Sequence, residues 1–429
     1  MRKQFSTIAV TLLLSCSSLI QAVPIEVIYS DGPNEGFNDP TLGPQRRAAF
    51  EYAMSIWSSR LQGNITITVD AAMDPLGGTP SVTTLGFAGP FNIFGNFQAA
   101  PVRDTWYVSA LANQLANIDI DDALGSNEVE AFAVFNSDVD NQIVLGSTDW
   151  YYGLDGNPPG NDISFVRTVL HEFGHAFGFI GILETNQNGI PTGNYDLFPS
   201  IYDRYVRRGN TNNAPALTSL SQSSRLAALT SDNLFWFGPA ATASSGQRLR
   251  LYAPSIWESG SSYSHYREGT NVNGQEELME PFLDTNKITL TNTDDLFKDL
   301  GWNLLGPTQL PTLNIASAPN NATEGIPYQY VFSLSGAQTQ PVTANVAFSG
   351  TATFNTDYTV SATTLTFPPG STSQSITVSP IAEQNVVDNN ETISIRVNRI
   401  IGAEFGNQLS ATTIVANALP QTRSTWMLY

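Results

Sequence analysis

The chain of 429 residues changes character near residues 306–312, and this change restricts the folds open to it. Before it, helical periodicities alternate with strand-like runs. After it, the chain shows only short runs of alternating apolar residues separated by turn signals such as PPGS (368–371). We therefore predict two units, one of helices and strands at residues 23–305 and an all-β sandwich at residues 312–418.

The first unit carries the signals of a sheet backed by a helix. Residues 24–29, 64–70 and 129–135 have the composition of strands, and the second of these alternates apolar residues with threonine. Residues 43–63 space their apolar side chains as a helix does and end in Gly63. Shorter helical signals, as at 223–235, punctuate residues 185–264, which we expect to be irregular.

The N-terminus has the pattern of a secretory signal peptide at residues 1–22. Arg2 and Lys3 precede an apolar run at residues 8–14, and Ala22 offers a cleavage position. We predict secretion to the extracellular space, with an outer-membrane lipoprotein anchored through Cys16 as the alternative. Because Cys16 is the only cysteine, the mature protein would have no disulfide and no thiol catalysis.

The charge of the chain excludes several classes of partner. Removal of residues 1–22 leaves 17 basic and 38 acidic residues, a net charge of −21. Nucleic acids and anionic membranes repel such a surface. The apolar run at residues 8–14 is also too short to span a bilayer. We expect no nucleic-acid partner, no transmembrane segment and a monomer.

The stretch HEFGHAFGF (171–179) predicts a metal site. His171 and His175 lie at i and i+4 of an expected helix beginning near residue 162 or 164, so both rings leave the same face. Glu172 is rotated by about 100° from His171 and is placed to act as a general base on a water. A chance match on a structural helix is the alternative, but the histidines lie on the polar stripe of this helix and not in its apolar face.

A catalytic zinc needs a third protein ligand, which the helix does not supply. Gly178 predicts a left-handed turn that ends the helix directly after His175. The chain has one further histidine, His265. Four carboxylates compete with it as third ligand: Glu184, Asp196, Asp203 and Glu258.

The HExxHxxG pattern resembles the metzincin signature, and residues 261–282 resemble the leishmanolysin branch of that family. The common form of the signature has a ligand where this chain has Gly181, whereas leishmanolysins insert a long segment before the third histidine. Here Ser264-His265-Tyr266 is followed by Glu277-Leu278-Met279-Glu280-Pro281, and residues 290–302 resemble the closing helix of those enzymes. The chain lacks the cysteines of that family.

This resemblance implies an α+β zincin catalytic domain with Zn²⁺ held by His171, His175 and His265. It implies that Met279 forms an apolar floor beneath the metal and that Glu172 is the base. The expected activity is that of a secreted zinc metalloendopeptidase, which hydrolyses protein or peptide substrates bound extended along a sheet edge. The alternative is a non-catalytic extracellular adhesion or binding protein on a zincin scaffold.

Two acidic stretches of the first unit, residues 117–122 and 137–141, bring oxygen ligands close together. Secreted proteases often bind calcium in loops, but the spacing here fits no known calcium loop. We therefore predict solvated surface at both stretches.

The second unit resembles a Calx-beta domain, an immunoglobulin-like sandwich. The resemblance rests on residues 322–325, 350–353, 357–358, 365–378 and 390–392. It implies Ca²⁺ binding by carboxylates at one end of the sandwich, at the matching positions Glu324, Asp357, Asp388 and Glu391. This chain has Glu383-Gln384 where the family has a pair of aspartates. We expect the unit to serve as an adhesion or spacer module.

Overall fold

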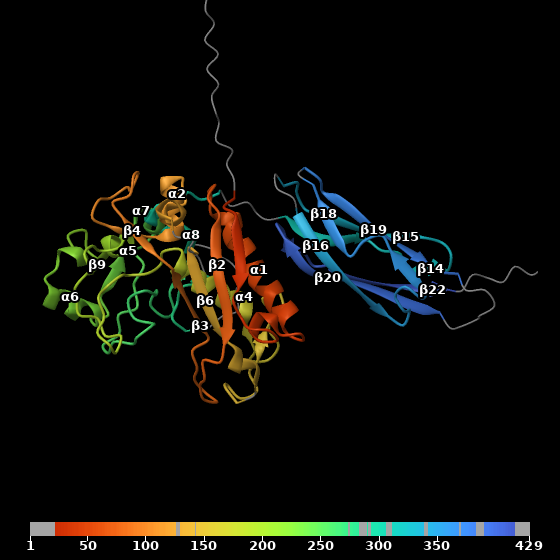
Figure 1. The fold of residues 1–429 in the computed structure, drawn as a ribbon, viewed down its shortest axis with the longest axis horizontal. Helices are drawn as coiled ribbons and strands as arrows, with labels where there is room; N and C mark the ends of the chain where they lie inside the picture. The colour runs from red at the N-terminus through yellow and green to blue at the C-terminus, as the bar shows by residue number, and fades with distance from the viewer. Residues whose placement is uncertain are drawn as a thin grey trace, which may run out of the picture.

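Two hydrophobic cores organise the chain in the computed structural model (Figure 1). The first extends from Val23 to Trp302 and the second from Leu313 to Val415. The structure describes residues 22–416 except 126–128, 142, 273–274, 283–289, 291–292, 306–310, 339–341, 369 and 383–389. The predicted signal peptide up to residue 21, Cys16, Asp388 and the end of the second unit at 417–418 therefore lie outside the described residues.

The first core is built on a four-stranded sheet with the strand order β1-β2-β6-β3. Its strands are β1 (Ile25–Tyr29), β2 (Ile67–Asp74), β6 (Ala131–Asn136) and β3 (Gly86–Pro90). The first three run parallel, and β3 runs antiparallel to β6. In β2 every second residue from Ile67 to Met73 is buried, as expected for a strand with one covered face. The predicted strands are confirmed, although β2 starts three residues later than expected.

Helices α1 (Gly43–Arg60) and α4 (Phe165–Ala176) pack against each other in this core. Pro44 lies in the first turn of α1, where its missing amide costs no hydrogen bond. The fully buried Trp57 donates its indole N–H to the carbonyl of Leu170 at 3.1 Å, which ties α1 to α4. The predicted helix at residues 43–63 is confirmed to Arg60.

Helix α4 begins and ends as its sequence predicts. The Ser164 hydroxyl accepts a hydrogen bond from the amide of Arg167 at its N-terminus. At its C-terminus Gly178 has φ +122°, a conformation that a side chain disfavours. The amide of Phe179 then donates to the carbonyl of Gly174 at 2.9 Å. The chain therefore leaves the helix one turn after His175.

Residues 182–264 form an insert that packs into the same core. It contains α5 (Ile201–Tyr205), β9 (Val206–Arg208), η3 (Leu217–Ser219), α6 (Gln222–Leu229), β10 (Leu234–Trp236) and α7 (Pro239–Ser245). The predicted closing helix is α8 (Thr293–Leu300). Its Asp299 accepts hydrogen bonds from the indole of Trp236 and the amide of Ala240, so the end of the unit holds the insert in place.

Short elements connect these parts. They are η1 (Gly36–Asn38), β4 (Ile93–Gly95), β5 (Trp106–Val108), α2 (Ser109–Ala116), α3 (Ile120–Leu124), η2 (Ser137–Asn141), β7 (Trp150–Tyr151), β8 (Ile163–Ser164), β11 (Asn271–Val272) and β12 (Gln275–Glu276). Among the described residues, no helix has the length and apolar character that a bilayer span requires.

The second core lies between two five-stranded sheets. The first has the order β17-β19-β15-β13-β21 and the second β14-β22-β20-β16-β18. The strands are β13 (Thr312–Ser317), β14 (Asn321–Thr323), β15 (Tyr328–Leu334), β16 (Val342–Gly350), β17 (Tyr358–Val360), β18 (Thr364–Phe367), β19 (Ser373–Pro380), β20 (Glu391–Ile401), β21 (Glu404–Phe405) and β22 (Ser410–Ala416). The all-β sandwich predicted for this part of the chain is confirmed.

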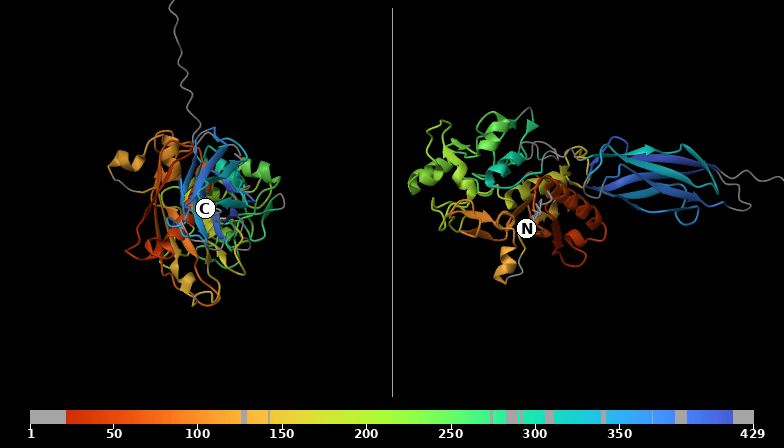
Figure 2. Two further views of the ribbon diagram at one scale, coloured as in Figure 1. Left: turned by 90° about the vertical axis from the view of Figure 1, so that its right-hand side faces the viewer. Right: turned by 90° about the horizontal axis from the view of Figure 1, so that it is seen from above.

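The sandwich and the insert lie at opposite ends of the long axis of the molecule, with the four-stranded sheet between them (Figure 2). Helix α1 contacts β20 of the sandwich. The rings of Tyr52 and Phe405 lie 5.8 Å apart at this junction, and Phe405 packs against both cores. The sandwich therefore contacts the first unit through α1 and is remote from the insert.

Candidate metal centre

Three histidines meet at the C-terminal half of α4. His171 and His175 come from successive turns of the helix, and His265 comes from the chain segment that follows the insert. Nε2 of His265 lies 3.0 Å from Nε2 of His171 and 3.1 Å from Nε2 of His175. All three side chains are buried, with 4–8% of their surface exposed. The structure therefore brings together the three residues that the resemblance implied.

The second nitrogen of each ring fixes its protonation. Nδ1 of His171 lies 2.8 Å from the carbonyl of Leu278, that of His175 lies 2.9 Å from Phe179, and that of His265 lies 2.7 Å from Ser261. A carbonyl only accepts, so each Nδ1 carries a proton and donates it. Each neutral ring then presents an Nε2 lone pair to the other two. Such an arrangement is favourable when a cation lies between the rings.

Burial keeps these rings neutral. It lowers the pKa of His171 and His265 well below the usual value, and the neighbouring histidines lower both further. Burial lowers the pKa of His175 to about 4. A metal binds the neutral ring, so the site does not have to lose protons near pH 7 before it binds one.

The donor set and its size fit zinc. Zinc takes imidazole nitrogens at about 2.0–2.1 Å in tetrahedral sites, which places two such nitrogens about 3.4 Å apart. The Nε2 separations of 3.0 and 3.1 Å are close to this value. Three protein nitrogens leave one position open, as in catalytic zinc sites.

Glu172 lies beside this group and is half-buried. Its carboxylate accepts a hydrogen bond from the backbone amide of Ala88 in β3, which lowers its pKa, but burial has the larger effect and raises the pKa to about 8. Strand β3 is the edge of the sheet, and within the described part of the chain it pairs with β6 alone. The carboxylate therefore joins the helix of the histidines to the sheet edge.

Met279 lies beneath the histidine-bearing turn of α4. It is fully buried, and a Cβ added to Gly174 would lie 2.3 Å from its Sδ. The preceding carbonyl, of Leu278, accepts the hydrogen bond from His171. The residues around Met279 therefore support the helix and orient one of its rings.

The four competing carboxylates do not join the histidines within the described residues. Asp203 is fully buried, and its carboxylate accepts a hydrogen bond from the hydroxyl of Tyr263. The Glu258 carboxylate accepts from the hydroxyl of Tyr252, and that of Glu184 accepts from Thr192. Asp196 lies on the exposed surface.

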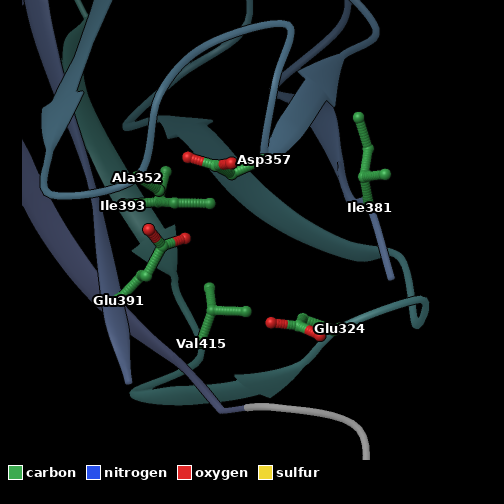
Figure 3. A pocket seen from close by; sticks show the side chains of 7 residues that line it. All are labelled: Glu324, Ala352, Asp357, Ile381, Glu391, Ile393 and Val415. Atoms are coloured by element: carbon green, nitrogen blue, oxygen red, sulfur yellow. The ribbon is translucent and has the colours of Figure 1, made fainter. Parts of the chain in front are cut away.

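The carboxylates predicted for calcium lie at one end of the sandwich. Figure 3 shows Glu324, Asp357 and Glu391 around a small pocket that is also lined by Ala352, Ile381, Ile393 and Val415. One oxygen of Asp357 accepts from the amide of Thr353 at 2.6 Å. The fourth predicted residue, Asp388, lies outside the described residues.

The prediction of solvated surface at residues 117–122 is wrong for Asp121. Asp119, Asp121 and Glu130 bring carboxylate oxygens within 4.8 Å of one another, and Asp121 and Glu130 are buried. Glu130 accepts from the amide of Thr68 at 2.6 Å and from Asn113 at 3.1 Å. Burial raises its pKa to about 7. Glu130 precedes a strand in the sequence, and no local pattern pairs it with residues 119–121.

The chain resembles solved structures only weakly. No family model and no curated protein matches it. The apo-form Calx CBD1 domain shares 19% identity over 25% of this chain and 98% of that chain, with a TM-score of 0.24. The Calx CBD2 domain shares 12% identity over 27% of this chain and 93% of that chain, with a TM-score of 0.24. CBD12 from CALX1.2 shares 18% identity over 25% of this chain and 45% of that chain, with a TM-score of 0.23. The match therefore covers less than half of the length of CBD12.

Proposed function

We propose that this chain is a secreted zinc-dependent endopeptidase with a metzincin-like zincin fold, similar to leishmanolysins. His171, His175 and His265 bind the zinc, and Glu172 is the general base. The observation that carries the proposal is the convergence of three Nε2 atoms while each Nδ1 donates to a carbonyl. A structural role alone does not require three unprotonated ring nitrogens to face one another.

The chemistry follows from the neighbours of the three rings. Zinc, when bound, supplies Lewis-acid activation of water and of a carbonyl group. The positive charge of a bound zinc would favour the ionised form of Glu172. Its carboxylate then accepts the proton of the attacking water and passes it to the nitrogen of the leaving amine. The amide of Ala88 holds this carboxylate toward the sheet edge. The base is thereby kept on the side from which a substrate approaches.

The substrate of this proposal is an extended polypeptide. Strand β3 pairs on one side with β6, while Ala88 on its other side reaches the base. An extended chain recognises such an edge through main-chain hydrogen bonds. Phe87 and Phe91, at 45% and 47% exposed, offer apolar surface at this strand for substrate side chains.

We further propose that the sandwich is a Calx-beta-like module that binds Ca²⁺ through Glu324, Asp357 and Glu391, with Asp388 outside the described residues. The position of the first three carboxylates around one small pocket supports it. The module would act as a spacer or adhesion unit, because it lies at the opposite end of the molecule from the insert.

The decisive experiment compares residues 23–429 with the Glu172→Ala variant on an unbiased peptide mixture at equal zinc content. We expect cleavage by the parent, its loss on addition of a chelator, and a reduction of 100-fold or more in the variant, about the contribution of a general base. If both proteins bind zinc and neither cleaves, the endopeptidase proposal fails. The non-catalytic binding protein on the same scaffold would then be the better description.

A further inference from the structure

The end of the insert packs against Gly181, the residue that directly precedes the insert. This is the position at which the common metzincin pattern has its third ligand. A Cβ on Gly181 would lie 1.9 Å from Cε1 of Tyr263, so the ring of Tyr263 fills the space that a side chain would need. The amide of Gly181 donates to the hydroxyl of Ser264 at 3.0 Å. The two residues before His265 are thereby fastened to the chain that leaves α4.

Tyr263 adopts a backbone conformation that is uncommon for a residue with a side chain. Its φ is +79°, in the region that residues with a side chain disfavour. Its amide donates to the carbonyl of Tyr252 at 2.7 Å, and its carbonyl accepts from the hydroxyl of Tyr202 at 2.7 Å. Its own hydroxyl donates to Asp203. These contacts hold the residue in place on both its backbone and its side chain.

Asp203 connects three separate segments. It is fully buried, and besides Tyr263 it accepts from the amide and hydroxyl of Ser200 at 2.7 and 2.8 Å and from the amide of Ile182 at 3.3 Å. Burying a carboxylate is costly unless hydrogen bonds compensate for the lost water, and these donors supply that compensation. The carboxylate thereby links the exit of α4, the start of α5 and the segment that carries His265.

We propose that Asp203 and Tyr263 are positioning residues of the metal centre, which hold His265 against the two helical histidines. The inference rests on the metal site of the proposed function. His265 follows Tyr263 by two residues, and its carbonyl accepts from the amide of Tyr252, the same residue whose carbonyl holds Tyr263. A shift of Tyr263 therefore moves the backbone from which the third ring extends. The insert thus serves as the outer support of the zinc ligands.

The test measures zinc affinity of the full chain by competition with a chromogenic chelator. Tyr263→Phe removes one hydroxyl from the support. We expect about tenfold weaker zinc binding, the lower end of the effect seen when an outer partner of a metal ligand is removed. Tyr330→Phe is the matched control, because it removes an equally buried hydroxyl, bonded to Thr413, from the sandwich. We expect unchanged zinc affinity in the control.

A second variant, at Gly181, disturbs the ring of Tyr263 without changing Tyr263 itself. Gly181→Ala keeps the backbone conformation, since Gly181 does not have positive φ, but places a methyl group in the ring of Tyr263. We expect weaker zinc binding and an altered visible spectrum of the Co²⁺-substituted protein, which reports ligand geometry. Circular dichroism of the metal-free variants verifies that they are folded.

The outcomes separate this inference from the proposed function. If Tyr263→Phe and Gly181→Ala are folded and bind zinc as the parent does, or if Tyr330→Phe weakens binding equally, the positioning role is wrong. Neither result depends on peptide cleavage. Intact zinc binding without cleavage by the parent contradicts the endopeptidase alone, whereas a parent that binds no zinc contradicts the metal centre and both proposals.

Discussion

The histidine centre and the carboxylate group of the sandwich differ in how their ligands are held. The three histidines are buried, and a carbonyl orients each ring. At the end of the sandwich, Glu324, Asp357 and Glu391 are only half-buried. Rigid, desolvated ligands give strong and selective metal sites, whereas partly solvated oxygen ligands give weaker ones. The comparison predicts a tight metal site in the first unit and a weak one in the second.

The largest expected effect is that of His265→Ala. Loss of one of three ligands should weaken zinc binding by more than about 100-fold, beyond the range for outer partners of a ligand. Chelator competition measures it. Glu391→Gln, in the sandwich, is the control and should leave zinc affinity unchanged. If His265→Ala binds zinc as tightly as the parent, His265 is not the third ligand, and one of the four carboxylates becomes the better candidate.

The next effect concerns pH and the first core. Because burial raises the pKa of Glu130 from 4.5 to about 7, its contribution to stability is present below pH 4.5 and is lost as the pH rises through 7. The loss is about 3 kcal/mol for a shift of this size. In the variant Glu130→Gln the side chain at this position has no ionisable group, so this contribution does not change with pH.

Thermal unfolding of parent and Glu130→Gln at pH 5 and pH 8 measures this difference. The free energy of unfolding of the parent should fall more between the two pH values than that of the variant. An identical pH dependence in the two proteins would show that Glu130 titrates normally. The free energy of unfolding of the sandwich core should have the same pH dependence in the parent and the variant.

A smaller effect is expected from packing around Met279. Gly174→Ala places a Cβ against its sulfur, and we expect a loss of about 1 kcal/mol in the free energy of unfolding. Gly336→Ala in the sandwich is the matched control, since a Cβ there meets nothing within 4 Å. Denaturant unfolding measures both variants. A stabilised Gly174→Ala would show that the floor of the site is loosely packed.

The last expected effect concerns calcium. Extracellular modules with few carboxylates bind Ca²⁺ with dissociation constants of about 10⁻⁴–10⁻³ M. Addition of about 10 mM Ca²⁺ should therefore stabilise the sandwich by about 1–3 kcal/mol. The unfolding temperature of the Asp357→Asn variant should not change when Ca²⁺ is added. A submicromolar affinity would contradict the contrast between the two sites.

Prediction from sequence succeeded where the pattern is local. The i, i+4 spacing of His171 and His175, the start of the helix near residue 164 and its end at Gly178 all depend on neighbours within one or two turns of α4. The alternating strands of the second unit are also local patterns. The support of His265 was not predictable, because Asp203 and Tyr263 lie in a segment without periodicity and meet through a hydrogen bond across 60 residues.

The sequence by itself determined the helix, its two histidines and the β-rich second unit, because backbone periodicity and capping act over a few residues. Only the tertiary structure showed which candidate for a third ligand lies beside the helical pair, because it brought Nε2 of His265 to within 3.1 Å of both rings. It also placed Glu130 beside Asp119 and Asp121. Such meetings depend on how the core closes, since burial and long-range hydrogen bonds select which distant segments come together.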